Sequence, residues 1–228
     1  MGLACRSGQS ASLGGLTRHP APEDLVEEAV ALPGRRLSVL RPRDSEALLD
    51  EDAFDHEEFL PYWAELWPSG VALARRIAGR ALRGARTLEL GCGLALPSMA
   101  AVLAGGRVLA TDWAPQAVAL ARENAARNGI ALEVMACAWQ RPDPLLERGP
   151  WDLVLGADLL YEQRNAETLL GLLPRLSAPG GEVLIADPGR APAERFLARA
   201  DGDFVVESMP APELPNGAIH RLRARLRA

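Results

Sequence analysis

The stretch Thr87-Leu88-Glu89-Leu90-Gly91-Cys92-Gly93-Leu94-Ala95 decides the fold. Its first residues favour a short apolar strand, its glycines favour a turn, and residues 96–104 favour a helix. A strand, a glycine turn and a helix in this order open a doubly wound α/β domain. Gly91 and Gly93 have no Cβ, so a ligand can lie directly against the backbone there. The stretch therefore predicts either a ligand-binding turn or a purely structural one.

The residues around the two glycines indicate which ligand such a turn binds. A dinucleotide-binding G-x-G-x-x-G turn needs a small residue where this chain has Leu96, and no Gly-Lys-Ser/Thr follows as in a phosphate-binding loop. The spacing is instead E-x-G-x-G-x-A, from Glu89 to Ala95. This spacing is similar to motif I of the class I S-adenosylmethionine-dependent methyltransferases, with alanine for the usual third glycine. The resemblance implies S-adenosylmethionine as the cofactor.

Length and composition narrow the class of protein. The 228 residues suit one α/β domain with a modest extension, and the net charge of -5 argues against nucleic-acid binding. All 25 basic residues are arginine, so the chain has no lysine of its own to modify. Cys5, Cys92 and Cys137 share no paired spacing and predict neither disulfides nor a zinc site. Because no apolar run reaches membrane-spanning length, we expect a cytoplasmic protein that binds neither a membrane nor a metal.

The remaining elements alternate as the βαβ units of a parallel sheet do. The strands predicted after the glycine turn span residues 107–111, 130–136, 151–155 and 181–186. Predicted helices span residues 115–127 and 165–176, and residues 204–208 and 218–227 predict a hairpin at the sheet edge. We therefore expect a doubly wound, mostly parallel, Rossmann-like α/β sheet with an antiparallel C-terminal hairpin.

The part of the chain before the glycine turn predicts three regions. Residues 1–22 show no periodicity and predict a disordered tail. Residues 23–60 form an extension with a short strand at 36–41 and an acidic run at 44–58. That run is either a solvated face or an attractive surface for a basic, lysine-bearing partner. The main domain is then expected to span residues 61–228.

The run Pro61-Tyr62-Trp63-Ala64-Glu65-Leu66-Trp67-Pro68-Ser69-Gly70 places three aromatic rings just before a helix predicted for residues 70–82. Such rings are costly to leave on a surface. They either belong to the core or form the wall of a pocket over the glycine turn. In a pocket they would stack on a purine or attract a sulfonium through a cation–π interaction.

Further candidate ligand contacts stand at the predicted carboxyl ends of the strands, where sheets of this kind bind their ligands. Asp112 ends the second strand, about 20 residues after the turn, where an acid can accept hydrogen bonds from ribose hydroxyls. Its alternative role is to cap the helix that begins near Pro115. Trp113 and Trp139 either border an adenine ring or belong to the core.

The run Asp158-Leu159-Leu160-Tyr161 follows the predicted fourth strand. If this run continues as a helical loop, Asp158 and Tyr161 face the same side. It resembles the D-x-x-Y motif of the seven-β-strand lysine methyltransferases of methyltransferase family 16. The match spans residues 61–190. Within it, residues 61–70 and Asp187-Pro188-Gly189-Arg190 are most similar to the enzymes that methylate the electron-transfer flavoprotein β-subunit and to their bacterial relatives.

This resemblance implies a seven-stranded sheet, methyl transfer from S-adenosylmethionine to a protein lysine, and the flavoprotein β-subunit as substrate. It places Asp158 and Tyr161 where the family positions the target lysine. The turn, the strand ends and the resemblance together place these residues at the cofactor: Trp67, Glu89, Gly91, Cys92, Gly93, Asp112, Trp113, Trp139 and Ala157. Ala138 departs from the family, which often has an acid before the tryptophan, so the contact to the adenine amino group is left unassigned.

Other functions fit part of the same pattern. A small-molecule N- or O-methyltransferase would share the sheet, the glycine turn and Asp112. A cofactor-binding protein without catalysis would act by docking to a partner. A Rossmann oxidoreductase would bind a dinucleotide instead.

Overall fold

The structure, a computed structural model, describes residues 20–48 and 61–225. Most of the predicted tail and the acidic residues from 50 to 58 lie outside this part of the chain. At the start of the acidic run, Asp44 accepts a hydrogen bond of 3.0 Å from the Glu46 amide, and Glu46–Leu48 form a 3-10 turn. The division into a tail, an extension and a main domain stays a prediction.

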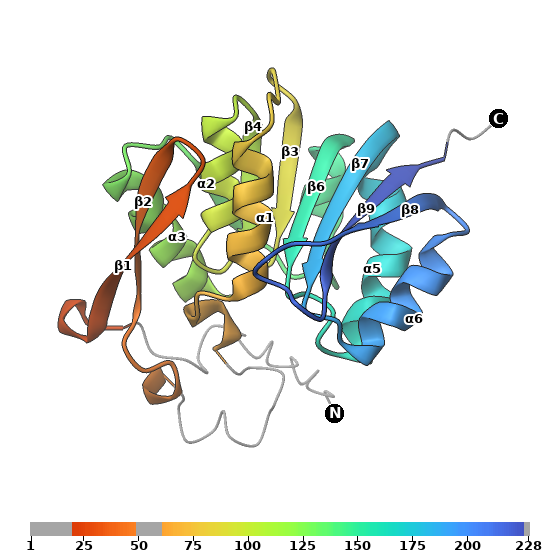
Figure 1. The fold of residues 1–228 in the computed structure, drawn as a ribbon. Helices are drawn as coiled ribbons and strands as arrows, with labels where there is room; N and C mark the ends of the chain where they lie inside the picture. The colour runs from red at the N-terminus through yellow and green to blue at the C-terminus, as the bar shows by residue number, and fades with distance from the viewer. Residues whose placement is uncertain (1–19, 49–60, 226–228) are drawn as a thin grey trace, which may run out of the picture.

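A seven-stranded sheet forms the centre of the molecule (Figure 1). Its strand order is β5-β4-β3-β6-β7-β9-β8, and β9 runs antiparallel to both of its neighbours. The strands are β3 (Arg86–Leu90), β4 (Arg107–Asp112), β5 (Glu133–Ala136), β6 (Trp151–Ala157), β7 (Ser177–Asp187), β8 (Phe204–Met209) and β9 (Ala218–Ala224). The predicted mostly parallel sheet with an antiparallel C-terminal hairpin is confirmed.

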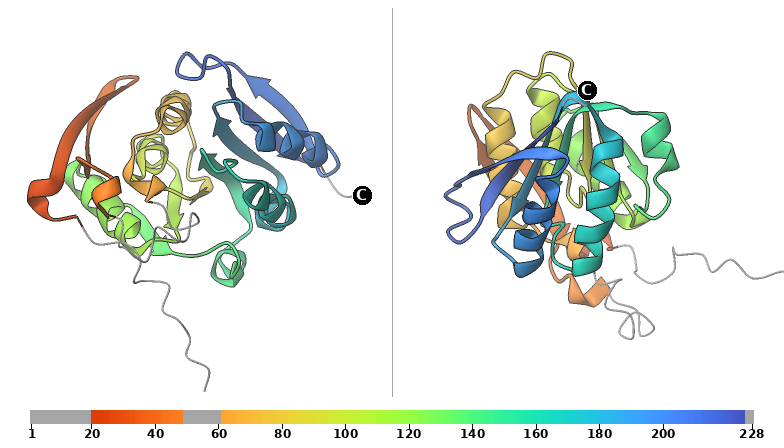
Figure 2. Two further views of the ribbon diagram at one scale, coloured as in Figure 1. Left: turned by 90° about the horizontal axis from the view of Figure 1, so that it is seen from below. Right: turned by 90° about the vertical axis from the view of Figure 1, so that its right-hand side faces the viewer.

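Helices cover both faces of this sheet, as the view from below shows (Figure 2). One face carries α1 (Pro68–Ala78), α2 (Leu96–Leu103) and α3 (Pro115–Arg127), and the other carries α4 (Asp143–Glu147), α5 (Gln163–Leu176) and α6 (Ala191–Ala200). Each face has its own hydrophobic cluster, one around Leu73 and Met99 and the other around Leu169 and Phe196. Two covered faces explain why the central strands are almost wholly apolar.

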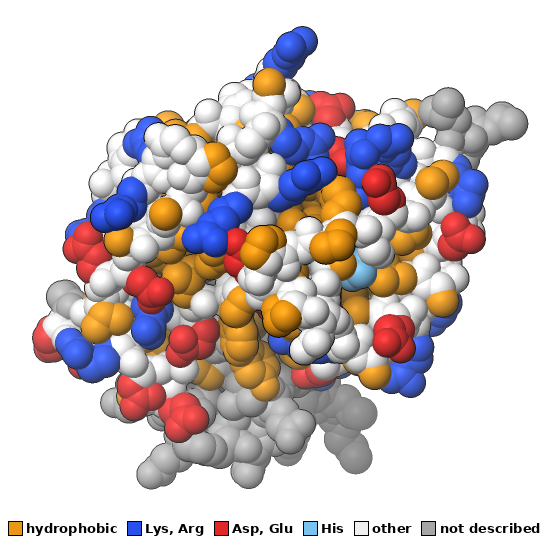
Figure 3. Space-filling view, in the orientation of Figure 1, with side chains coloured by type: hydrophobic (Ala, Val, Ile, Leu, Met, Phe, Trp, Pro, Cys, Tyr) orange, Lys and Arg blue, Asp and Glu red, His pale blue; other side chains and the backbone are white. Residues whose placement is uncertain are grey.

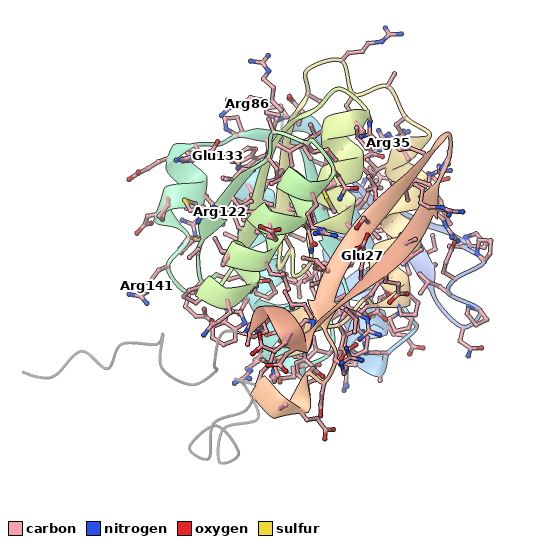
Figure 4. All side chains as sticks on the ribbon, turned by 90° about the vertical axis from the view of Figure 1, so that its left-hand side faces the viewer. Glu27, Arg35, Arg86, Arg122, Glu133 and Arg141 are labelled. Carbon is pink, nitrogen blue, oxygen red and sulfur yellow. The ribbon has the colours of Figure 1, made fainter. Side chains whose placement is uncertain are left out.

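A separate hairpin of β1 (Leu25–Leu32) and β2 (Arg35–Pro42) lies across α3 (Figure 4). Asn124 of α3 and Asn128, the residue that caps the C-terminal end of α3, hold it. Asn124 Oδ1 accepts from the Leu40 amide at 2.7 Å, and its Nδ2 donates to the Leu40 carbonyl at 3.1 Å. Asn128 does the same for Ser38, at 2.9 and 2.7 Å. The sequence predicts β2 but not its partner β1.

Some predicted boundaries are wrong for identifiable reasons. Strand β5, predicted to begin at residue 130, begins at Glu133. The reason is that the Ile130 amide donates to the Ala125 carbonyl at 2.9 Å and closes the end of α3. Gly129 has a φ of +66° there, the left-handed conformation that ends many helices. Helix α1 ends at Ala78, before Gly79, and not at residue 82. The sequence analysis predicts neither α4 nor α6.

Charged side chains of both signs are mixed on the face shown in Figure 3. Arg80 pairs with Glu182 at 2.6 Å, and Arg221 contacts Glu182 and Glu207. Of the two arginines in β9, Arg221 therefore meets carboxylates, and Arg223 is exposed. Within residues 20–48 and 61–225, the helices are all too short or too polar to cross a membrane.

Candidate active site

A cavity of about 440 Å³ opens where β3 and β6 end. The chain leaves β3 toward β4 on one side and returns to β6 on the other, so this is the switch point at which doubly wound sheets bind ligands. In Figure 1 these strand ends point to the lower edge of the sheet. The cavity is lined by every residue predicted for the site: Trp67, Glu89, Gly91, Cys92, Gly93, Asp112, Trp113, Trp139, Ala157, Asp158 and Tyr161.

The glycine turn needs its missing side chains. Gly93 has a φ of +47°, and a Cβ at this position would lie 3.0 Å from the Trp63 carbonyl oxygen. A Cβ on Gly91 would lie 2.7 Å from the Leu159 side chain. The turn therefore packs closely against the Trp63 backbone and the Leu159 side chain, and its own backbone lines the cavity. A ligand in this cavity can approach the main chain directly.

Asp112 joins the glycine turn to the next strand. Its Oδ2 accepts a hydrogen bond of 3.0 Å from the Gly93 amide, and its Oδ1 accepts one of 3.0 Å from the Ala114 amide. The N-cap of α3 is Ala114, so Asp112 holds the residue that starts the helix and is not itself the cap. Burial raises the pKa of this carboxyl group. Each oxygen keeps acceptor capacity that a ribose hydroxyl can use, and that role stays a prediction.

Glu89 is buried beneath the turn. One carboxyl oxygen accepts from the Ser98 amide at 2.9 Å and also contacts the Ser98 hydroxyl. Burial raises the pKa of Glu89 to about 8, although both contacts with Ser98 act to lower it. The side chain therefore ties the first turn of α2 to strand β3 and carries its proton over most of the physiological range.

The aromatic residues before α1 form one wall of the cavity. The Trp67 indole N–H donates to the Tyr62 carbonyl at 2.7 Å, and the two rings meet edge to face with centroids 6.4 Å apart. Tyr62 also lies 5.2 Å from the ring of Tyr161. Trp63 lines the cavity and is buried in the hydrophobic cluster as well. The two alternatives for this run, core and pocket wall, are thus both realised.

Asp158 stands directly after β6 with a φ of +58°, in a turn and not in the helical loop that the sequence suggested. Its amide donates to the Ala186 carbonyl at 2.9 Å, which fixes the backbone. Its Oδ1 accepts from the Arg190 guanidinium at 2.6 Å, whereas its buried Oδ2 makes no hydrogen bond of good geometry among the described residues and has only the neutral Ser69 hydroxyl beside the carboxylate. Burial raises the pKa of Asp158, and Ser69 and Arg190 oppose that rise.

Arg190 is a charged cavity residue to which the sequence analysis assigned no role. The only signal was its place in the quoted Asp187-Pro188-Gly189-Arg190 run. The fully buried Asp187 carboxylate accepts from the Gly189 and Arg190 amides, both at 2.8 Å, and from the Arg190 guanidinium at 3.3 Å. Its importance rests on a contact with Asp158 that spans 32 residues, which local patterns do not reveal.

The donor set of the cavity fits an adenosyl ligand with a cationic sulfur. Bare backbone at the glycine turn, a carboxylate at Asp112 and the rings of Trp67 and Trp139 can meet the sugar, the base and the sulfonium. Within the described ranges, no three His, Cys, Asp or Glu side chains gather as metal ligands would. Cys92 and Cys137 are buried free thiols.

Comparison with known proteins assigns this chain to a family. A family model described as lysine methyltransferase matches residues 62–203, which include all the cavity residues named above. The chain belongs to this lysine methyltransferase family. The match starts within the aromatic run before α1 and ends just before β8, so it covers both the site and most of the sheet.

Individual proteins of similar sequence carry related names. The electron transfer flavoprotein beta subunit lysine methyltransferase of Xenopus laevis is 38% identical over 138 residues, covering 58% of this chain and 54% of that protein. The EEF1A lysine methyltransferase 3 of Mus musculus is 33% identical over 170 residues, covering 71% of this chain and 72% of that protein. The chain spans about half the length of the first curated relatives it matches.

A solved structure supports the fold. SMU.776, a methyltransferase crystallised with S-adenosylhomocysteine, superposes on this chain with a TM-score of 0.61 at 11% sequence identity. The superposition covers 90% of this chain and 57% of the SMU.776 chain. At this identity the likeness concerns the arrangement of strands and helices.

Proposed function

We propose that this chain is an S-adenosylmethionine-dependent protein-lysine N-methyltransferase. The observation that carries the proposal is the position of Asp158. A buried carboxylate whose Oδ2 makes no ion pair and no hydrogen bond of good geometry lines the same cavity as the bare glycine turn, in a member of the lysine methyltransferase family. A buried carboxylate oxygen with spare acceptor capacity is stabilised when a ligand supplies a donor, and a lysine nitrogen is such a donor.

The cavity residues around the glycine turn would hold the cofactor. The Gly91–Gly93 backbone would contact the methionine portion of the cofactor. Asp112 would accept from the sugar hydroxyls, and Trp67 and Trp139 would face the base or the sulfur. When bound, S-adenosylmethionine supplies a methyl carbon that the lysine nitrogen attacks, and the carbon–sulfur electron pair returns to sulfur. The pre-existing contacts of Asp112 with Gly93 and Ala114 hold its carboxylate in place before the ligand arrives.

Asp158 would orient the acceptor nitrogen and would not take its proton. A free lysine has a pKa of about 10.4, and a carboxylate that remains ionised beside an arginine is a weak base for such a group. The benefit lies in alignment, because holding reacting atoms in line is worth up to about 7–11 kcal/mol in ideal cases. Tyr161, next to Tyr62, would form the wall along which the acceptor side chain enters.

We further propose a protein substrate, with the electron-transfer flavoprotein β-subunit as the first candidate. Its support is the motif similarity at residues 61–70 and 187–190 and the names of several matched relatives. The lysine-free sequence is consistent with a catalyst that acts on another chain.

The experiment is to incubate the purified chain with methyl-labelled S-adenosylmethionine and recombinant flavoprotein β-subunit, and to hydrolyse the protein fraction. We expect label in methyl-lysine, all of it from the substrate because this chain contains no lysine. The matched control is the β-subunit with its modified lysines changed to arginine. Label found only in small molecules from a cell extract would favour a small-molecule methyltransferase. Cofactor binding without transfer to either fraction would favour the docking protein.

A further inference from the structure

In the proposed lysine site, the ion pair with Arg190 engages only one of the two carboxylate oxygens of Asp158. Oδ1 is held by the guanidinium at 2.6 Å, whereas Oδ2 makes no ion pair and no hydrogen bond of good geometry in the described part of the chain, with the neutral Ser69 hydroxyl beside the carboxylate. We propose that Arg190 is a positioning residue of the acceptor site. It holds Oδ1 and offsets the charge of Asp158, so that Oδ2 binds the target amine in its neutral, nucleophilic form. This inference rests on the proposed function.

The loop that carries Arg190 is built to keep it in place. Asp187 caps the loop through the Gly189 and Arg190 amides. Gly189 has a φ of +94°, and a Cβ there would lie 2.2 Å from the Asn216 carbonyl oxygen. A Cβ on Gly217 would lie 2.1 Å from the Asp187 carbonyl oxygen. The loop after β7 and the loop before β9 thus pack backbone against backbone, which fixes the main chain from which the Arg190 side chain reaches Asp158.

The charges around the acceptor carboxylate explain what Arg190 adds. Two carboxylates, Asp158 and Asp187, lie near the Arg190 guanidinium, and Ser69 of α1 is the neutral neighbour of Asp158. Among the described residues, the other charged or titratable groups on this side include Glu162 and Arg164 of the following turn and helix, which pair with each other, and Glu65, Glu89 and Asp112, which also line the cavity. Without Arg190, the negative charges of Asp158 and Asp187 would be uncompensated beside the amine of the target lysine.

An uncompensated carboxylate would bind the acceptor in the wrong protonation state. A nearby negative charge favours the ammonium form of lysine, which has no lone pair for attack. The ammonium would then replace the missing guanidinium as the partner of Asp158. With Arg190 present, that place is already filled, and the carboxylate can orient a neutral amine without raising its pKa. Arg190 therefore determines which form of the acceptor is bound.

The test is the pH dependence of kcat at saturating flavoprotein β-subunit, measured with the full chain, because kcat reports the protonation state of the lysine in the enzyme–substrate complex. In Arg190→Gln we expect the rising limb to move up by about one pH unit, which is about a tenfold loss at pH 7 that disappears near pH 10. Arg190→Lys keeps the charge and should keep the wild-type midpoint. Arg195→Gln, an exposed arginine on the following helix α6, is the matched control and should change nothing. Calorimetric cofactor affinity verifies that each variant is folded.

A loss of rate in Arg190→Gln that is equal at all pH values would overturn the inference, as would an equal defect in Arg190→Lys. If the wild-type chain does not methylate the β-subunit at all, the proposed substrate fails, and a second measurement still tests Arg190. NMR titration of ¹³C-labelled aspartate should then show a higher pKa for Asp158 in Arg190→Gln than in the wild type. An unchanged Asp158 pKa would show that Arg190 does not compensate its charge.

Discussion

Individual residues set the chemistry of the cavity, and Asp158 shows this most directly. Its backbone is fixed by the Ala186 carbonyl, and its side chain contacts Arg190 rather than the glycine turn. We predict that Asp158→Ala keeps cofactor affinity within about threefold but lowers kcat by a factor of about 100 or more, because alignment of the acceptor is lost. Calorimetry and single-turnover rates measure the two effects separately. Asp143→Ala, at the exposed start of α4, serves as control.

Gly93 shows how one absent methyl group shapes the binding surface. An alanine there would carry the strain of a φ of +47° and would also place its Cβ 3.0 Å from the Trp63 carbonyl oxygen. We predict that Gly93→Ala weakens cofactor binding at least about tenfold, since the turn must shift away from its ligand-facing position. Gly129→Ala has a similar φ of +66° with open space around it. It should cost about 1–2 kcal/mol of stability and leave affinity unchanged.

At the scale of elements, α3 supports the hairpin and the glycine turn together. Besides Leu40, the buried Asn124 side chain reaches the Leu94 carbonyl of the turn at 3.3 Å. We predict that Asn124→Ala lowers the free energy of unfolding by about 2–4 kcal/mol, because it leaves backbone groups of β2 and the turn without partners. Urea unfolding measures this. The adjacent Glu123→Ala faces solvent and should stay within about 0.5 kcal/mol of wild type. Equal effects in the two variants would contradict the proposed support.

The sequence predicted most elements because their signals are local. Helix α3 was located to the residue, since Pro115 starts it and Asn128-Gly129 ends it. Strand β1 was missed because Glu27 and Glu28 interrupt its apolar alternation, and only pairing with β2 makes it a strand. Helix α6 was missed because only three of its residues, Ala193, Phe196 and Ala200, are buried.

The site was predictable to the extent that it follows from the strand order. Once the strands are placed, their ends meet at one edge, so every predicted residue lines the same cavity. Arg190 could not be assigned in this way, since its role depends on an ion pair between two loops after neighbouring strands. The roles of the cavity residues stay predictions until a ligand is bound.

For the whole molecule, burying acids beneath the cavity makes stability depend on pH. In the folded chain Glu89 keeps its proton up to about pH 8, whereas an unfolded glutamate releases it near 4.5. Between these values the folded state binds more protons, so stability falls as pH rises, by about 5 kcal/mol in total from this group. The raised pKa values of Asp112 and Asp158 act in the same direction.

We therefore predict that the free energy of unfolding is lower at pH 8.5 than at pH 5.5, and that Glu89→Gln removes much of this difference. Glutamine is neutral at both pH values, and its carbonyl oxygen can still accept from the Ser98 amide. Denaturant unfolding at the two pH values measures the slope. Glu123→Gln, an exposed glutamate, should keep the wild-type slope. A wild-type chain that is more stable at pH 8.5 would contradict the raised pKa of Glu89.

The amides of Asn124 and Asn128 occupy the side of β2 that faces away from β1. They satisfy the donors and acceptors that a further strand would otherwise use. An open strand edge is a template for pairing between molecules. The two asparagine side chains thus pair with the exposed edge of β2 as a neighbouring strand would. A chain lacking both would be prone to self-association and to amyloid-like aggregation through this edge, as well as to unfolding.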